Sequence, residues 1–357
     1  MTSFSLTRRE APSRVALWFS PIAAVALTLF AGSALFAAIG ADPWQGVHTF
    51  LIAPLSNVRG WSEIALKATP LALCALGLAL CFRANVWNIG AEGQLIVGAI
   101  AAGSVALLAT PETPRAYVAC VLLAAAIGGA AWASITAWLR DRFNANEILV
   151  SLMLVYVAQQ LISWMVQGPL RDPQGYGFPQ SELFAAAARV PVIVEGSRLN
   201  LGSVLTLLAA AAIWLLLARS VIGYQLKVVG LAPRAARYAG FSPRRTLWIA
   251  LLISGALAGL AGGLEVAGPI GQLTASVSPG YGFAAIIVAF VGRLHPVGIV
   301  LASIVMALFY IGGELAQSRL GLPAALTGVY QGMLLFFLLA CDTLIDYRLQ
   351  RRISVQA

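Results

Sequence analysis

Polar side chains gather in residues 83–94, RANVWNIGAEGQ, although long apolar stretches flank this segment on both sides. Asn85, Asn88 and Gln94 carry amides, which both donate and accept hydrogen bonds, and Glu92 adds a carboxylate to them. On a helix, Asn85 and Asn88 would share one face at i, i+3, and Glu92 would follow Asn88 at i+4. Such a group of side chains suits either of two tasks: lining the route of a polar solute, or pinning a broken helix. The residues alone leave both interpretations open.

Other polar and aromatic residues within the apolar stretches extend this set. A charged group inside a bilayer costs about 2.5–3.5 kcal/mol on insertion scales, so such groups usually face a cavity, a partner or an aqueous path. Tryptophan rings are able to stack on a flat solute ring, although aromatic belts and helix packing explain them at least as well. The candidate path residues are Asn85, Trp87, Asn88, Glu92, Gln94, Gln159, Trp164 and Glu265.

The composition decides which class of protein positions these groups. Of the 357 residues, 60% are hydrophobic and only 10% are charged, whereas soluble domains carry roughly 25% charged residues. So few charges do not cover a water-facing surface. We therefore expect an all-α polytopic membrane protein.

Known catalytic and metal-binding motifs are missing from the sequence. It contains no G-x-x-x-x-G-K-[ST], no H-E-x-x-H and no G-x-S-x-G, so neither a Walker ATP site nor a common hydrolase site is predicted. The four cysteines lie in apolar runs without a C-x-x-C pair, and only two histidines are present. We therefore expect no enzymatic activity, no metal site and no cofactor.

Ten apolar stretches are candidate membrane spans, since a helix needs about 20 apolar residues to cross. The eighth is too short to cross unless it is broken or re-entrant. Glycines interrupt both the third stretch and the segment 278–292, a pattern found in transporters built from repeats. Within the seventh, Gly255, Gly259 and Gly263 recur every fourth residue and predict close helix packing. The ten stretches are 15–41, 63–82, 86–108, 116–139, 147–166, 199–218, 247–267, 282–291, 297–313 and 323–341.

The basic residues predict the orientation of the chain. With the amino terminus inside, 16 of the 23 lysines and arginines fall on the cytoplasmic side, as the positive-inside rule requires. We expect cytoplasmic tails at 1–14 and 342–357 around a transmembrane domain at 15–341. Because the excess charge lies in loops that face anionic lipid, nucleic-acid binding is not indicated.

Two loops are candidates for partner contacts. The cytoplasmic loop 219–246 holds PRAARYAG, a short helix-prone piece that suits either a socket for a soluble partner or a basic surface along the lipid. The extracytoplasmic loop 168–199 is rich in proline and glycine and is predicted to consist of turns. In it, Arg171 and Asp172 are either a contact surface or an ion pair that braces the loop.

Four stretches carry a family resemblance: RANVWNIGAEGQLIVGA, NEILVSLMLVYVAQQLISWMVQGPLRDPQG, GLAPRAARYAGF and SGALAGLAGGLEVAG. Together they resemble the permease subunit of bacterial ABC importers, in the branch that serves branched-chain amino acids, simple sugars and nucleosides. The combination of NxGAEGQ with GPLRDP is most similar to the larger nucleoside permease subunit. The resemblance covers roughly residues 65–340.

The resemblance implies a type II importer fold in the bacterial inner membrane. Its implied partners are a separate ABC ATPase, a second permease subunit that is identical or homologous, a periplasmic or lipid-anchored solute-binding protein, and membrane lipid. Arg171 and Asp172 would meet the binding protein. The part of the cytoplasmic loop that would couple to the ATPase comprises Gly230, Pro233, Arg234, Ala235, Ala236 and Gly240.

Rival functions remain open from sequence. A secondary transporter that uses Glu92 or Glu265 as a proton carrier is one, although that class needs no cytoplasmic docking loop. The same permease role for a simple sugar or a branched-chain amino acid is another. A membrane enzyme is disfavoured because its motifs are missing.

Overall fold

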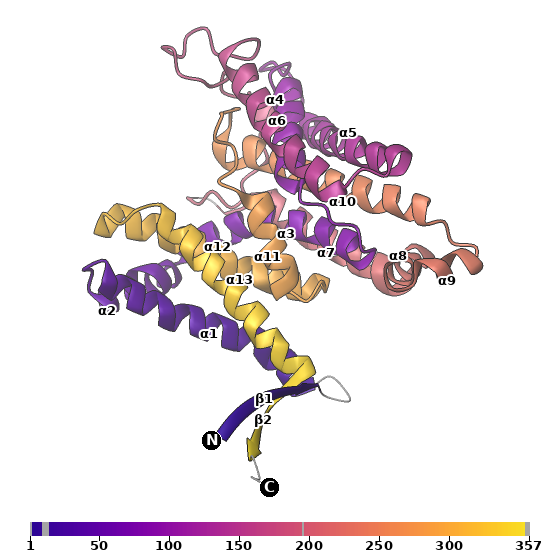
Figure 1. Ribbon diagram of the computed structural model, residues 1–357. Coiled ribbons are helices and arrows are strands. Elements are labelled where there is room, and N and C mark those ends of the chain that lie inside the picture. The colour runs from indigo at the N-terminus through magenta and orange to yellow at the C-terminus, as the bar shows by residue number, and fades with distance from the viewer. Residues whose placement is uncertain (1, 9–13, 195, 354–357) are drawn as a thin grey trace. The chain divides into compact units, whose positions relative to one another are not determined.

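The computed structural model describes residues 2–8, 14–194 and 196–353, and these are helical apart from one pair of strands (Figure 1). The long helices are α1 (Arg14–Ala38), α3 (Val58–Arg83), α5 (Val118–Phe143), α6 (Glu147–Gln167), α7 (Leu201–Arg219), α10 (Pro243–Glu265), α12 (Pro296–Leu320) and α13 (Ala325–Asp346). The short helices are α2 (Pro43–Val47), α4 (Ala91–Ala106), α8 (Val221–Leu231), α9 (Pro233–Tyr238) and α11 (Tyr281–Val291).

Each of the ten predicted spans overlaps a helix, in the same order along the chain. Eight helices of the described chain are long and apolar enough to cross a bilayer, and α4, α8 and α11 are shorter apolar helices, of which α8 was not predicted as a span. The eighth predicted span is indeed short, since α11 has 11 residues. The third span, 86–108, is interrupted near its start, because α4 begins only at Ala91 and the residues before it are not helical. The all-helical membrane architecture is thus confirmed.

The chain forms two compact units, whose boundaries fall within α3 and α12. We call Trp61–Ala307 the central unit, and Met1–Gly60 with Leu308–Ala357 the terminal unit. Each is described by itself.

Three helices, α4, α5 and α10, pack together in the central unit, and α6 packs against α4 (Figure 1). Glycines allow their backbones to touch. A Cβ atom added to Gly98 on α4 would lie 2.3 Å from the Cα of Gly259 on α10, and one added to Gly129 on α5 would lie 2.2 Å from the carbonyl oxygen of Gly255. Real side chains do not fit at such distances. The predicted packing role of the α10 glycines is therefore confirmed.

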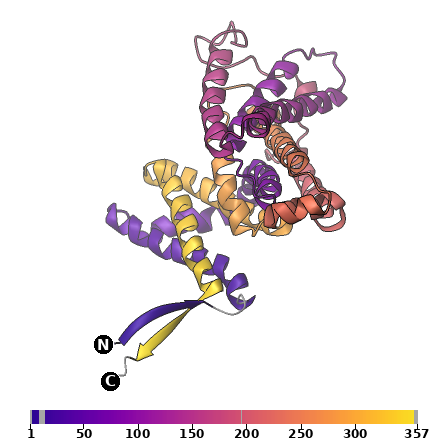
Figure 2. The ribbon, with the colours of Figure 1, turned by 45° about the vertical axis from the view of Figure 1, so that its right-hand side comes forward.

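An aromatic core holds the terminal unit together, where α1 packs along α13 (Figure 2). The rings of Phe50 and Tyr330 stack with centroids 4.3 Å apart, and Phe36 and Phe309 lie against the same Tyr330 ring at 6.0 and 5.8 Å. Close aromatic pairs of this kind contribute stability beyond the area that they bury.

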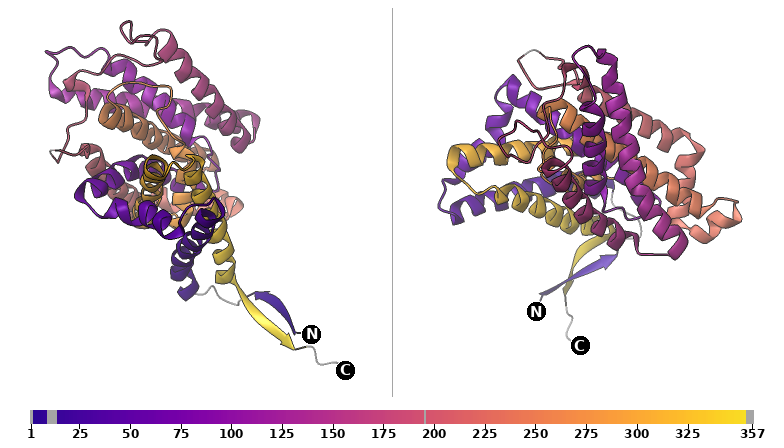
Figure 3. Two further views of the ribbon diagram at one scale, coloured as in Figure 1. Left: turned by 90° about the vertical axis from the view of Figure 1, so that its left-hand side faces the viewer. Right: turned by 90° about the horizontal axis from the view of Figure 1, so that it is seen from above.

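The two tails pair as a short antiparallel sheet, β1 (Thr2–Arg8) with β2 (Tyr347–Ile353) (Figure 3). Its register places Thr2 opposite Ile353 and Arg8 opposite Tyr347. Both segments are expected from sequence only as polar tails, and their pairing as strands is not predicted. Strand pairing between segments so distant in sequence leaves little local signal, which is why the tails alone do not predict it.

Candidate functional site

The chain leaves the helical conformation between α3 and α4, at the polar segment 83–94. Asn85 has φ +55°, and the N–H of Val86 bonds to the carbonyl oxygen of Cys81 at 2.9 Å. This is the usual way a helix ends, with a residue in the left-handed conformation that asparagine tolerates. Asn85 and Asn88 do not share a helical face, because α3 ends at Arg83 and both residues follow it, so the predicted alternative of a broken helix is the one that is found.

Asn88 lies at the centre of a buried amide network. Its Nδ2 donates to Gln94 Oε1 at 3.1 Å and to Ser254 Oγ at 3.0 Å. Its Oδ1 accepts from Gln94 Nε2 at 3.1 Å and from the N–H of Gly90 at 3.0 Å. An asparagine amide has two donor hydrogens and two acceptor lone pairs, so Asn88 uses its full hydrogen-bonding capacity within the chain. The network fixes the non-helical segment against α10.

Glu92 connects the two short apolar helices. Its Oε2 accepts a hydrogen bond from the N–H of Gly282 at 2.6 Å, and its side chain is buried. Next to Gly282, the hydroxyl of Tyr281 bonds to the Nζ of Lys67 on α3 at 2.9 Å. Residues from α3, α4 and α11 thus meet around the first turn of α11.

Asn85 and Trp87 differ from these buried groups because both are exposed in the chain. The Trp87 ring lies 5.3 Å from the ring of Phe82 and 6.3 Å from the ring of Phe290, and it keeps 39% of its surface exposed. We call the non-helical residues 84–90 between α3 and α4 the helix break. Its exposed side presents the Asn85 amide and the Trp87 ring, while Asn88 on its other side is packed within the protein.

The remaining candidate path residues lie elsewhere in the central unit. Gln159 and Trp164 occupy the exposed side of α6, whereas Ser151 on its buried side accepts a hydrogen bond from the N–H of Ile89 at 3.2 Å. Glu265 is nearly buried at the end of α10. The structure therefore brings Asn88, Gln94 and Glu92 together at the break, but not the whole predicted set.

The loop 219–246 forms two short helices, α8 and α9. The predicted helix is present as α9, with Pro233 at its first position and Gly240 at φ +79° just beyond its end. Ala236 is its single buried residue, and Gly230 packs on the end of α3, where an added Cβ would lie 2.1 Å from the Arg83 carbonyl oxygen. The exposed residues include Leu231, Arg234, Ala235 and Tyr238.

In the loop 168–199, Asp172 contributes a turn and not the ion pair with Arg171 that was one of the two predicted alternatives. The Asp172 carboxylate accepts from the N–H of Gln174 at 2.8 Å and so closes a turn. Arg171 is exposed, and no ion pair joins Arg171 to Asp172 in the part of the chain that the structure describes. The Asp172 turn and backbone bonds such as that from the N–H of Asp172 to the Gln180 carbonyl oxygen at 2.9 Å stabilise the loop, and a partner contact of the exposed Arg171 stays a prediction.

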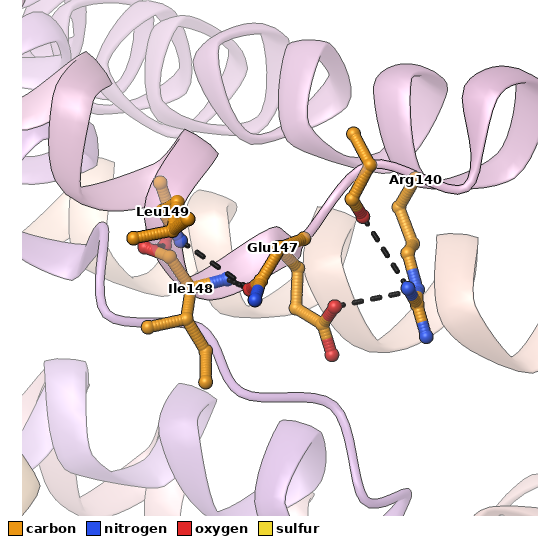
Figure 4. A network of polar contacts seen from close by, with 7 residues as sticks. Arg140, Glu147, Ile148 and Leu149 are labelled. Carbon is orange, nitrogen blue, oxygen red and sulfur yellow. Dashed lines mark hydrogen bonds and ion pairs between the residues drawn. The ribbon is translucent and has the colours of Figure 1, made fainter.

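The end of α5 is joined to the first turns of α6 and α10 by charged contacts. Across the α5–α6 turn, Arg140 pairs with Glu147 at 3.3 Å and donates to the Ala145 carbonyl oxygen (Figure 4). Asp141 accepts from Arg244 at 2.6 Å and from the Trp248 indole at 3.0 Å, which ties α5 to the start of α10.

Residues 60–339 match the family described as branched-chain amino acid transport system / permease component. This stretch covers well over half of the chain. The chain belongs to this permease family. The matched residues contain the helix break, the glycine packing and both loops, so the resemblance inferred from the four stretches is confirmed. The protein is an ABC transporter permease and a multi-pass membrane protein.

Three relatives are similar to the permease over nearly its whole length. A glucose ABC transporter permease of Haloferax volcanii is 34% identical over 96% of this chain and 92% of its own. A guanosine ABC transporter permease of Bacillus subtilis is 32% identical, covering 89% and 91%. A nucleoside ABC transporter permease of Lactococcus lactis is 27% identical, covering 94% of each.

Four residues at the permease's helix break escaped sequence reasoning: Lys67, Ser151, Ser254 and Gly282. Serine and glycine are ordinary packing residues in membrane helices, so their types gave no signal. Lys67 did carry one, because a lysine ten residues into an apolar helix is costly without a partner.

Proposed function

We propose that this permease is the membrane subunit of an ATP-driven importer of a small polar solute, with nucleosides as its first candidate cargo. The single observation that carries the transport role is the family match over residues 60–339. The nucleoside assignment rests on the guanosine and nucleoside permeases of Bacillus subtilis and Lactococcus lactis, which align over at least 89% of this chain.

Glucose, or another simple sugar, is the second candidate. The Haloferax volcanii glucose permease supports it with 34% identity. A nucleoside and a sugar share ring hydroxyls, which amides such as Asn85 hydrogen-bond. Only a nucleoside offers a flat base to stack on an exposed indole such as that of Trp87 or Trp164. Branched-chain amino acids, named in the family description, are a third class.

The solute path is proposed to run along the exposed side of the helix break. On this proposal Asn85, Trp87, Gln159 and Trp164 contact the solute, and Glu265 stays a candidate at the end of α10. The hydrogen-bonded pair Asn88 and Gln94 would hold the helix break in place from its buried side, without contacting the solute. Binding of ATP in a partner would change the relative stability of two permease conformations, because a ligand acts on such an equilibrium only through its differential affinity.

The surface of α9 is proposed to dock on the ATPase. Exposed Arg234, Ala235 and Tyr238 with buried Ala236 support this, since one face is anchored and the other is open. We also propose that both termini are cytoplasmic in the plasma membrane, that a second permease subunit completes the path, and that a solute-binding protein meets Arg171 and its loop.

The test is uptake into vesicles that contain the complete transporter, using tritiated guanosine, radiolabelled glucose and radiolabelled leucine. The proposal expects ATP-dependent guanosine uptake that a protonophore leaves intact. Glucose uptake alone would support the second candidate. Uptake that a protonophore abolishes while ATP is held constant would contradict the ATP-driven mechanism and favour a proton carrier.

A further inference from the structure

Two short helices of the central unit, α4 and α11, begin at the same point. A Cβ atom added to Gly282, in the first turn of α11, would lie 2.2 Å from the backbone nitrogen of Glu92 and 2.5 Å from its Cα. Glu92 is itself in the first turn of α4. The backbones of the two amino-terminal turns are therefore in direct contact, and only a residue without a side chain fits there.

Two helix amino termini in contact create an electrostatic problem. Each carries the equivalent of roughly half a positive charge and unpaired N–H groups. In an apolar surrounding these partial charges are poorly screened, so the two ends disfavour each other. The junction needs a negative group to stabilise it.

Glu92 supplies this group to both helices. It is an acidic residue in the first turn of α4, and its Oε2 accepts a hydrogen bond from the N–H of Gly282 at 2.6 Å. A hydrogen bond to an ionised acceptor is roughly twice as strong as one between neutral groups. The Ser278 hydroxyl accepts from the N–H of Tyr281 at 3.1 Å and also bonds to the Glu92 carboxylate. Glu92 is 2% exposed, so its carboxylate is enclosed by protein.

We infer that Glu92 is a positioning residue, whose carboxylate holds the amino termini of α4 and α11 together so that the helix break keeps the shape transport requires. It contacts neither solute nor a transported proton. The inference rests on the permease role and not on which solute is carried.

Three roles for Glu92 predict different effects of the same variants. A positioning carboxylate affects the maximal uptake rate and leaves the KM and solute preference unchanged. A solute ligand changes KM or the preference between solutes. A proton carrier changes the pH dependence of uptake, because E92Q cannot release a proton.

The experiment compares E92Q, E92D and the unmodified chain in vesicles that contain the complete transporter. Removing the charge in E92Q is expected to lower the maximal rate about tenfold, which lies within the range that a charge contributes at a partly buried helix terminus. E92D keeps the charge and is expected to recover most of the rate. The KM and the pH profile should be those of the unmodified chain in both variants.

Several results would overturn the inference: an unchanged rate in E92Q, a raised KM, an altered pH profile, or E92D as impaired as E92Q. If E92Q does not assemble, S278A supplies the test, because it removes one bond to the Glu92 carboxylate and adds no atom at the junction. S278A should lower the rate at unchanged KM, and a normal rate in S278A together with a normal rate in E92D would refute the junction.

Uptake is measured with both tritiated guanosine and radiolabelled glucose. A wrong solute assignment then appears as missing guanosine uptake in the unmodified chain. A wrong assignment of Glu92 appears instead as variants that match the unmodified chain for whichever solute is carried.

Discussion

The carboxamides of Asn88 and Gln94 exchange two hydrogen bonds, each 3.1 Å long, between the non-helical segment and the first turn of α4. Both side chains are buried. Buried polar groups are costly unless they are paired, and a fully paired set rigidifies the structure around it. The pair therefore fixes the shape of the break. The Asn88 amide has no donor or acceptor left to bind a solute.

Loss of the Asn88 amide should destabilise the permease. N88A leaves Ser254, Gln94 and the N–H of Gly90 without this partner, and each buried polar group left unpaired costs about 1–3 kcal/mol. We expect a clearly lower thermal unfolding midpoint in detergent. The matched control is N85G, because Asn85 is exposed and glycine adopts its φ of +55° without strain. Equal midpoints for the two variants would contradict the network's role.

Glycine packing between α5 and α10 should tolerate no added methyl group. In G259A the new Cβ would lie 2.2 Å from the Ala125 carbonyl oxygen and close to Gly129 of α5, so the helices must separate. We expect little folded protein on size-exclusion chromatography. The control is G332A on α13, where nothing lies within 4 Å of the added atom, and its yield should be normal. A normal yield of G259A would contradict the close packing.

Substitutions on α9 and in the Arg171 loop should each disrupt one partner contact and leave the other intact. A235R adds a large charged side chain to the exposed face of α9 and should prevent co-purification of the ATPase, while binding-protein association persists. R171E reverses an exposed charge in the outer loop and should weaken delivery of solute by the binding protein, while the ATPase still co-purifies. Each variant is the control for the other. If both associations survive in both variants, the proposed surfaces are misassigned.

The Asp141 contacts should differ in importance. Arg244 is exposed, and exposed ion pairs contribute little and weaken further in salt. The Trp248 indole, by contrast, is half-buried and loses its acceptor when Asp141 is removed. D141A should therefore lower the thermal unfolding midpoint more than R244A. A larger effect of R244A would show that the ion pair, and not the indole bond, holds α5 to α10.

The number and order of the membrane helices could be predicted from sequence, because apolar length is a strong signal. The short α11 and the helix α9 followed from the same logic, the first from its length and the second from Pro233 and Gly240. In each case the feature that determines the helix lies in the helix itself or directly beside it in sequence.

The geometry of the break could not be predicted. Whether Asn85 continues α3 or ends it depends on the bond from Val86 to Cys81 and on the packing of Asn88 against Ser254, which is 166 residues away. The partner of Glu92 lies 190 residues away. A polar pattern indicates that such groups need partners, but it does not identify partners so distant in sequence.

The central claim is that the exposed side of the break, at Asn85, borders a solute path that changes with the transport cycle. It is tested most directly by the labelling rate of N85C with a membrane-impermeant maleimide, in vesicles that hold the complete transporter. C120A removes the exposed native cysteine, and buried Cys74 serves as the unreactive reference.

The account predicts that N85C is labelled, that adding ATP and vanadate changes its rate, and that the carried solute slows it. Cys74 should stay unlabelled throughout. A rate for N85C that is the same in every nucleotide state and insensitive to solute, or no labelling at all, would contradict the claim.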